Sequence, residues 1–124
     1  FDEGNEENAI VASIEIQEFI EKFKMGDLGK KISIGIGINY GEVVFGTVGT
    51  KKRMEATVLG DTVNIASRLE NLTRTYQKNI IISNSLYEKV KNKSNFSINY
   101  LGKEILRGKE KEIEFYGIDS YFVI

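Results

Sequence analysis

The 124-residue sequence contains no cysteine, histidine, proline or tryptophan. Without cysteine it offers no disulfide, no thiolate zinc site and no cysteine nucleophile, and without histidine it lacks the commonest metal ligand and the usual general base. Ser-His-Asp catalysis, Cys-His catalysis and histidine-zinc chemistry are therefore excluded. A metal ion bound by this chain would have to be a hard cation with oxygen ligands.

Long apolar runs and an excess of one charge are also absent. No run approaches the ~20 apolar residues of a membrane span and no signal peptide is visible, so we expect a cytoplasmic segment without membrane contact. The chain has 17 Lys and Arg against 18 Asp and Glu, which gives no reason to expect nucleic-acid binding. Residues 1–24 contain seven acidic and two basic residues, so the remainder has a net positive charge that could meet a phosphate-bearing ligand.

Two segments in the first third of the chain have clear hydrophobic periodicity. Residues 8–24 should form a helix, because apolar side chains recur there every three or four positions. This stripe consists of Ala9, Ala12, Ile16, Phe19, Ile20 and Phe23. Residues 32–39 alternate strictly between isoleucine and small or polar residues, which predicts a strand. Gly35 and Gly37 share one face of that strand, so another group can approach its backbone closely.

The rest of the chain predicts further strands and two more helices. One helix should follow Gly60, and a short one should begin near residue 84, capped by Ser83, Asn84 or Ser85. Strands are expected at 42–48, 55–59, 80–82, 96–106, with an interruption near Gly102, and 113–123. Helices interleaved with strands that are joined by hairpins favour an α/β fold with a mixed sheet. This arrangement is closer to an α+β sandwich than to a purely parallel wound sheet.

The helix after Gly60 carries two polar side chains of chemical interest. With Asp61 as its N-cap, Asn64 and Arg68 lie one turn apart, about 40° from each other around the axis. A guanidinium and a carboxamide that project together suit an anionic oxygen. Spacing alone favours a structural alternative, in which Asn64 supports the cap and Arg68 forms a surface salt bridge.

A specific motif covers this helix. The segment Gly60-Asp-Thr-Val-Asn-Ile-Ala-Ser-Arg68 fills every position of the pattern Gly-Asp-x-Val-Asn-x-Ala-Ser-Arg. Together with the glycine-rich run 35–49, with Arg53-Met54 and with the closing segment 106–116, it resembles the C-terminal part of a class III adenylyl/guanylyl cyclase catalytic domain. The resemblance implies that residues 1–124 are the C-terminal portion of one such domain. The fold would then be a ferredoxin-like mixed sheet with helices, in a truncated version that lacks the first strands.

Such enzymes convert ATP to cyclic AMP and pyrophosphate at the interface of two catalytic domains. The resemblance implies that Asn64 orients the ribose and that Arg68 stabilises charge developing on the α-phosphate. Arg107 would contact the terminal phosphates, with a solvated turn charge as the alternative. Thr57 matches the position that discriminates the purine, and its hydroxyl can accept from the adenine amino group. ATP is therefore the expected substrate, although a β-branched residue at this position also suits the predicted strand.

The same resemblance implies a metal requirement. The family binds Mg²⁺ or Mn²⁺ through two aspartates, and both would precede residue 1 of this chain. We therefore assign no metal ligand here and expect this fragment alone to be inactive. Uncovered strand edges should favour pairing with a second copy, so the expected partners are ATP and a homodimer partner domain. The alternative is a non-catalytic dimerising or nucleotide-sensing domain of the same family, against which the presence of Asn64, Arg68 and Thr57 argues.

Overall fold

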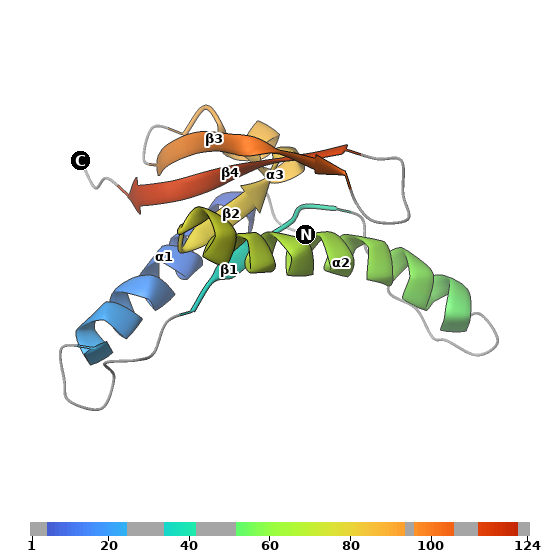
Figure 1. Ribbon diagram of the computed structural model, residues 1–124, viewed down its shortest axis with the longest axis horizontal. Helices are drawn as coiled ribbons and strands as arrows, with labels where there is room; N and C mark the ends of the chain where they lie inside the picture. Colours follow the sequence, from blue (N-terminus) through green and yellow to red (C-terminus); the bar gives the residue numbers. More distant parts are fainter. Residues whose placement is uncertain (1–4, 25–33, 42–51, 94–95, 106–111, 122–124) are drawn as a thin grey trace.

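The computed structural model describes residues 5–24, 34–41, 52–93, 96–105 and 112–121, with the side chains of 23–24, 52–60 and 120–121 excepted. Figure 1 shows three helices and four strands in this part of the chain. They are α1 (Asn5–Lys24), β1 (Ile36–Ile38), α2 (Lys52–Tyr76), β2 (Ile80–Ser83), α3 (Asn84–Val90), β3 (Phe96–Ile105) and β4 (Glu112–Tyr121). None of the helices described is long and apolar enough to cross a membrane.

The four strands form one mixed sheet in the order β1-β2-β4-β3. β1 and β2 are parallel, whereas β4 is antiparallel to both β2 and β3. β3 and β4 follow each other in the chain and pair along almost their full length, as expected for a hairpin. The mixed sheet flanked by helices confirms the predicted fold class.

The sheet separates two apolar clusters. On one face, which we call the α2 face, Ile65, Leu69 and Leu72 of α2 pack against Ile81 and Phe115. On the opposite face, α1 and α3 pack against the other side chains of the same strands. This second cluster consists of Ile10, Ile80, Ile82, Leu86, Val90, Phe96 and Ile118. Successive residues of β2 point to opposite faces, so one short apolar strand serves both clusters.

α2 lies directly against the backbone of β1. A Cβ atom added at Gly37 would lie 2.6 Å from the backbone oxygen of Ala66, and one added at Gly35 would collide with the side chain of Thr73. The predicted close approach at these two glycines is therefore confirmed, and the group that approaches is α2 itself. At Gly37 no side chain separates the helix from the strand, whereas at Gly35 the side chain of Thr73 lies between them.

The start of α2 differs from the prediction. The strand predicted at 55–59 and the helix predicted to begin at Asp61 are both wrong, because α2 begins at Lys52 and runs through this region. Residues 53–56 read Arg-Met-Glu-Ala, which are all strong helix formers, so local propensity continues the helix toward its N-terminus. Asp61 consequently lies inside the helix, and the alternative role of Asn64 as a support for its cap is wrong too.

α1 begins at Asn5 and buries a different face from the predicted one. Ile10 is fully buried and Ile14 packs against the same cluster, whereas Ile16 and Phe19 of the predicted stripe are 47% and 66% exposed. The helix carries apolar residues on two faces, and the sheet contacts only one of them. Periodicity alone could not choose between the two faces.

Local signals in the second half of the chain were more informative. Ser83 caps α3, where its Oγ accepts a hydrogen bond of 3.3 Å from the backbone N–H of Leu86. The predicted interruption of β3 is confirmed, because the pairing with β4 shifts by one residue between Tyr100 and Gly102. Gly102 has φ of +156°, which favours glycine. The strand predicted at 42–48 lies outside the described residues.

The C-terminus of α2 is fixed by a backbone motif. Gln77 follows the helix with φ of +54°, and the backbone N–H of Lys78 donates to the oxygen of Thr73 at 3.0 Å. This six-to-one hydrogen bond is the signature of a Schellman cap, in which the left-handed position is usually glycine. Here a glutamine occupies this left-handed position, and its Cβ atom causes steric strain that glycine would avoid.

Candidate active site

Asn64 and Arg68 lie on the central turns of α2, and both side chains are exposed. Their neighbours Ile65 and Leu69 are buried against the sheet. The helical spacing predicted for the pair is therefore confirmed, and the two side chains lie beside the buried stripe. Figure 1 shows that the N-terminal turns of α2 extend past the sheet.

Arg68 is held by an acidic residue of the edge strand β3. Its Nε donates a hydrogen bond of 2.5 Å to Oε1 of Glu104, and the two side chains are 46% and 32% exposed. The hydrogen bond to Glu104 raises the pKa of Arg68 above its ordinary value, with a further contribution from the charge of Glu104. The surface salt bridge that the structural alternative assigns to Arg68 is thus present, and the guanidinium remains cationic.

The orientation of Glu104 depends on the irregularity in β3. Ile98 and Tyr100 lie opposite Ile118 and Tyr116, which contribute to the cluster under α1 and α3. Strict alternation would place Glu104 on that same face. The shift at Gly102 sets Glu104 opposite Ile113 instead, and Ile113 packs into the cluster of the α2 face. One extra residue in the strand therefore turns this carboxylate toward α2.

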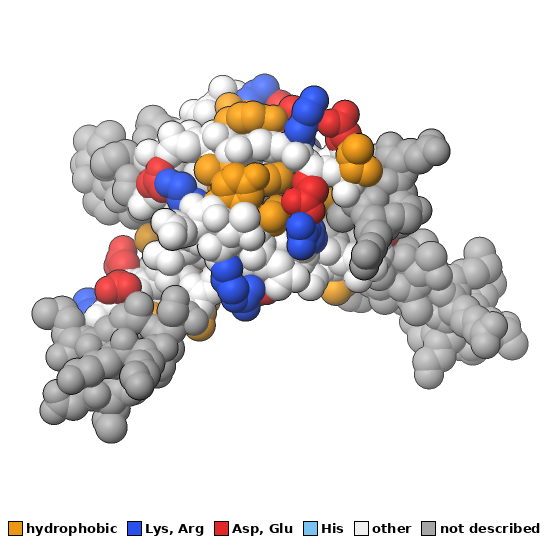
Figure 2. All heavy atoms as spheres, in the orientation of Figure 1, with side chains coloured by type: hydrophobic (Ala, Val, Ile, Leu, Met, Phe, Trp, Pro, Cys, Tyr) orange, Lys and Arg blue, Asp and Glu red, His pale blue; other side chains and the backbone are white. Residues whose placement is uncertain are grey.

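Figure 2 shows this side of the molecule, where apolar side chains gather and basic and acidic side chains lie next to them.

The residues that the sequence analysis assigned to the nucleotide are only partly brought together. Thr57 lies in α2, but its side chain is not among those that the structure describes. Arg107 lies outside the described residues. Glu104 was missed by sequence reasoning, because its orientation depends on the strand shift near Gly102.

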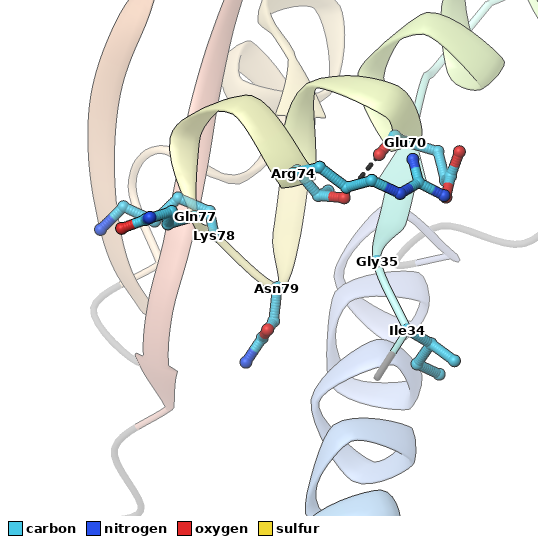
Figure 3. A pocket seen from close by; sticks show the side chains of 8 residues that line it. Ile34, Gly35, Glu70, Arg74, Gln77, Lys78 and Asn79 are labelled. Carbon is cyan, nitrogen blue, oxygen red and sulfur yellow. Dashed lines mark hydrogen bonds and ion pairs between the residues drawn. The ribbon is translucent and has the colours of Figure 1, made fainter. Parts of the chain in front are cut away.

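A hollow of about 700 Å³ lies at the other end of α2 (Figure 3). Its lining includes Gly35 at the start of β1, Arg74, Lys78 and Asn79. Arg74 lies about 9 Å along the axis from the level of Arg68. Its Nη2 is 3.0 Å from Oε1 of Glu70, and Figure 3 shows these two labelled side chains next to each other. This hollow is therefore separate from the Asn64 and Arg68 pair.

The cations around the hollow are already engaged. Arg74 pairs with Glu70, and Nζ of Lys78 lies 2.7 Å from Oδ1 of Asp119 on β4. Asn99 of β3 also donates to the carboxylate of Asp119. These ion pairs neutralise the positive charges that line the hollow. The hollow therefore does not favour the binding of an anion.

A metal site is not formed by the residues that the structure describes. Within them, no three acidic, histidine or cysteine side chains are grouped closely enough to hold a metal ion. The described part of the chain therefore does not fit the Mg²⁺ or Mn²⁺ that the sequence resemblance implies.

Comparison with known proteins identifies the family. The model of the adenylate and guanylate cyclase catalytic domain matches residues 4–120, so the chain belongs to that family. An adenylate cyclase of Anabaena cylindrica is 40% identical over 128 residues, which cover 97% of this chain and 26% of that protein. The terminal-differentiation specific adenylate cyclase of Dictyostelium discoideum is 34% identical over 113 residues, which cover 90% of this chain and 5% of that protein.

A solved structure supports the fold. The crystal structure of an adenylate/guanylate cyclase/hydrolase from Silicibacter pomeroyi is similar to this chain with a TM-score of 0.69 and 21% identity. The match covers 95% of this chain and 63% of that one. The chain thus spans about a quarter of the Anabaena protein and a much smaller part of the Dictyostelium protein. These comparisons confirm the resemblance found in the sequence.

Proposed function

We propose that this chain is part of a nucleotide cyclase that converts ATP to cyclic AMP and pyrophosphate. The observation that carries the proposal is the pair Asn64 and Arg68, one turn apart and exposed on α2, within a completely filled family motif. Membership of the cyclase family and the similarity to adenylate cyclases support it. Arg68 is cationic and accessible, as a group that meets a phosphate must be.

In the proposed reaction the ribose 3′ oxygen attacks the α-phosphorus in line, and pyrophosphate leaves. Asn64 orients the ribose through its carboxamide. Arg68 donates to the oxygens of the α-phosphate, where negative charge develops in the transition state. Donors that are fixed before the reaction stabilise this charge without reorganising, and such an interaction accelerates the step because it strengthens in the transition state.

The other proposed site residues, Thr57 and Arg107, have side chains that the structure does not describe. Thr57 accepts a hydrogen bond from the adenine amino group, which selects ATP over GTP, and Arg107 contacts the terminal phosphates. When bound in the intact domain, an Mg²⁺ or Mn²⁺ ion would neutralise the charge of the triphosphate and help to activate the nucleophile. Its ligands are proposed to lie outside the described residues, in the intact domain, so residues 1–124 alone are inactive. A second copy of the domain completes the site as a homodimer.

A non-catalytic role in the same family is the second candidate. The ion pair between Arg68 and Glu104 favours it, because a guanidinium engaged by a carboxylate needs no nucleotide to be satisfied. A domain of this kind would dimerise or sense a nucleotide without turnover.

A cyclase assay of the full-length protein with Mn²⁺ and either ATP or GTP separates the two candidates. Arg68→Ala should lower kcat on the order of 100-fold or more, with a much smaller change in nucleotide affinity. Arg74→Ala is the matched control, because Arg74 lies on the same helix and forms a comparable exposed ion pair, with Glu70. Equal effects of the two substitutions, or no turnover of either nucleotide by the wild-type protein, would reject the catalytic proposal.

A further inference from the structure

Among the residues that the structure describes, the guanidinium of Arg68 contacts a partner at only one of its three nitrogens. Nε donates to Glu104, whereas Nη1 and Nη2 form no hydrogen bond or ion pair with any residue that the structure describes. A carboxylate that blocked an arginine would be expected to take the two-pronged arrangement in which both carboxylate oxygens are used. Here the bond at Nε leaves the four N–H groups of the Nη nitrogens for another acceptor.

Stability does not account for this ion pair. Both side chains are well exposed, and exposed ion pairs of this kind contribute little to folding because solvent screens them. A free arginine side chain, however, samples many rotamers. A hydrogen bond at Nε restricts those rotamers before a ligand arrives, so less entropy is lost when the guanidinium binds an anion.

The backbone is built to place the carboxylate at this point. Glu104 turns to the α2 face only because the pairing of β3 with β4 shifts between Tyr100 and Gly102. Gly102 adopts the positive φ of 156° that accompanies this shift. Two elements that are distant in the chain, the centre of α2 and the end of β3, therefore converge on one side chain.

We propose that Glu104 is a positioning residue for Arg68, which it holds through Nε so that Nη1 and Nη2 face a phosphate of the nucleotide. This inference rests on the proposed cyclase function, since it assigns a task to the guanidinium of the same site. Glu104 does not touch the nucleotide. Its effect is transmitted through the orientation of Arg68, and it therefore acts on kcat more than on substrate affinity.

The test compares Glu104→Ala, Glu104→Gln and Glu112→Ala in the full-length protein, with ATP and Mn²⁺ as the probe. Glu112→Ala is the control, because Oε2 of Glu112 lies 3.3 Å from Nζ of Lys103 in an exposed ion pair of the same hairpin. Glu104→Ala should lower kcat roughly tenfold with little change in KM, comparable to the loss of an outer hydrogen-bonding partner in other sites. Glu104→Gln should restore most of the rate, because its carboxamide oxygen can accept the same hydrogen bond.

Three kinetic results would overturn the inference. A rise in kcat for Glu104→Ala would show that Glu104 competes with the phosphate instead of aligning Arg68. Equal rates for Glu104→Ala and Glu112→Ala would show that the contact has no effect on the reaction. A loss in Glu104→Gln as large as that in Glu104→Ala would show that the hydrogen bond is not the relevant feature.

A second measurement does not depend on activity. In a protein labelled with ¹⁵N-arginine, the Nε–H signal of Arg68, assigned with Arg68→Lys, should shift and exchange faster in Glu104→Ala but not in Glu112→Ala. An unchanged signal would overturn the positioning role even if the enzyme is active. A wild-type protein without cyclase activity would reject the proposed function, and this signal would then still decide whether Glu104 orients Arg68.

Discussion

α1 and α2 flank the same sheet, yet they meet it in different ways. α2 places Ile65, Leu69 and Leu72 on the sheet, and its backbone rests directly on Gly37 of β1. α1 buries Ile10 and leaves Ile16 half exposed. An apolar stripe is therefore buried only where the sheet offers a surface that matches it. The helix that carries the candidate site is the one that is fixed more tightly.

Side-chain truncation on the two helices should give the largest contrast. Leu69→Ala removes a side chain that is 1% exposed, so unfolding should become easier by about 3 kcal/mol. Ile16→Ala removes apolar atoms that are largely in water, and its cost should stay below about 1 kcal/mol. Urea denaturation monitored by circular dichroism measures both values. Equal losses of unfolding free energy would show that Ile16 is as buried as Leu69, which would contradict the difference between the two helices.

Substitution of the β1 glycines should give the next largest effect. Gly37→Ala forces a Cβ to within 2.6 Å of the backbone oxygen of Ala66 and should cost about 2 kcal/mol. Gly41→Ala is the matched control, because its Cβ would meet side chains and no backbone, with the nearest atoms those of Thr62 at 3.2 Å. The same denaturation experiment compares them, and a tolerated alanine at Gly37 would contradict the direct packing of α2 on β1.

The smallest expected effect concerns the end of α2. Gln77→Gly should stabilise the protein by about 0.5–1 kcal/mol, because glycine adopts the left-handed conformation without the steric cost of a Cβ atom. Glu15→Gly, at an exposed position inside α1, is the control and should destabilise by about 1 kcal/mol. Thermal unfolding shows whether each substitution raises or lowers the melting temperature. A destabilising Gln77→Gly would mean that the glutamine side chain itself holds the end of the helix.

The fold was predictable where the signal is local. Ser83 caps the short helix, and Gly102 interrupts β3, because capping and positive φ depend on one or two residues. The start of α2 was not predictable in this way, since Asp61 has the chemistry of a cap but sits in the middle of a longer helix. The buried face of α1 depends on where the sheet lies, and the sequence pattern contains no such information.

The candidate site likewise contains residues that could be predicted from local sequence and one that could not. Asn64 and Arg68 were identified from the motif, and their separation by one turn follows from helix geometry. Glu104 could not be identified, because residues 96–105 alternate in a way that assigns it to the opposite face. Only the pairing of β3 with β4 reveals that it turns toward Arg68.

The contact between β1 and α2 has a mechanical consequence. With only a hydrogen atom on Gly37, the backbone of β1 meets the backbone of α2 at Ala66 and Glu70, and the missing side chain at Gly35 makes room for Thr73. Closely packed atoms cannot slide past each other without overlap, so we expect the helix and the strand to move as one unit. A shift of β1 should then be passed on to the central turns of α2, which carry Asn64 and Arg68.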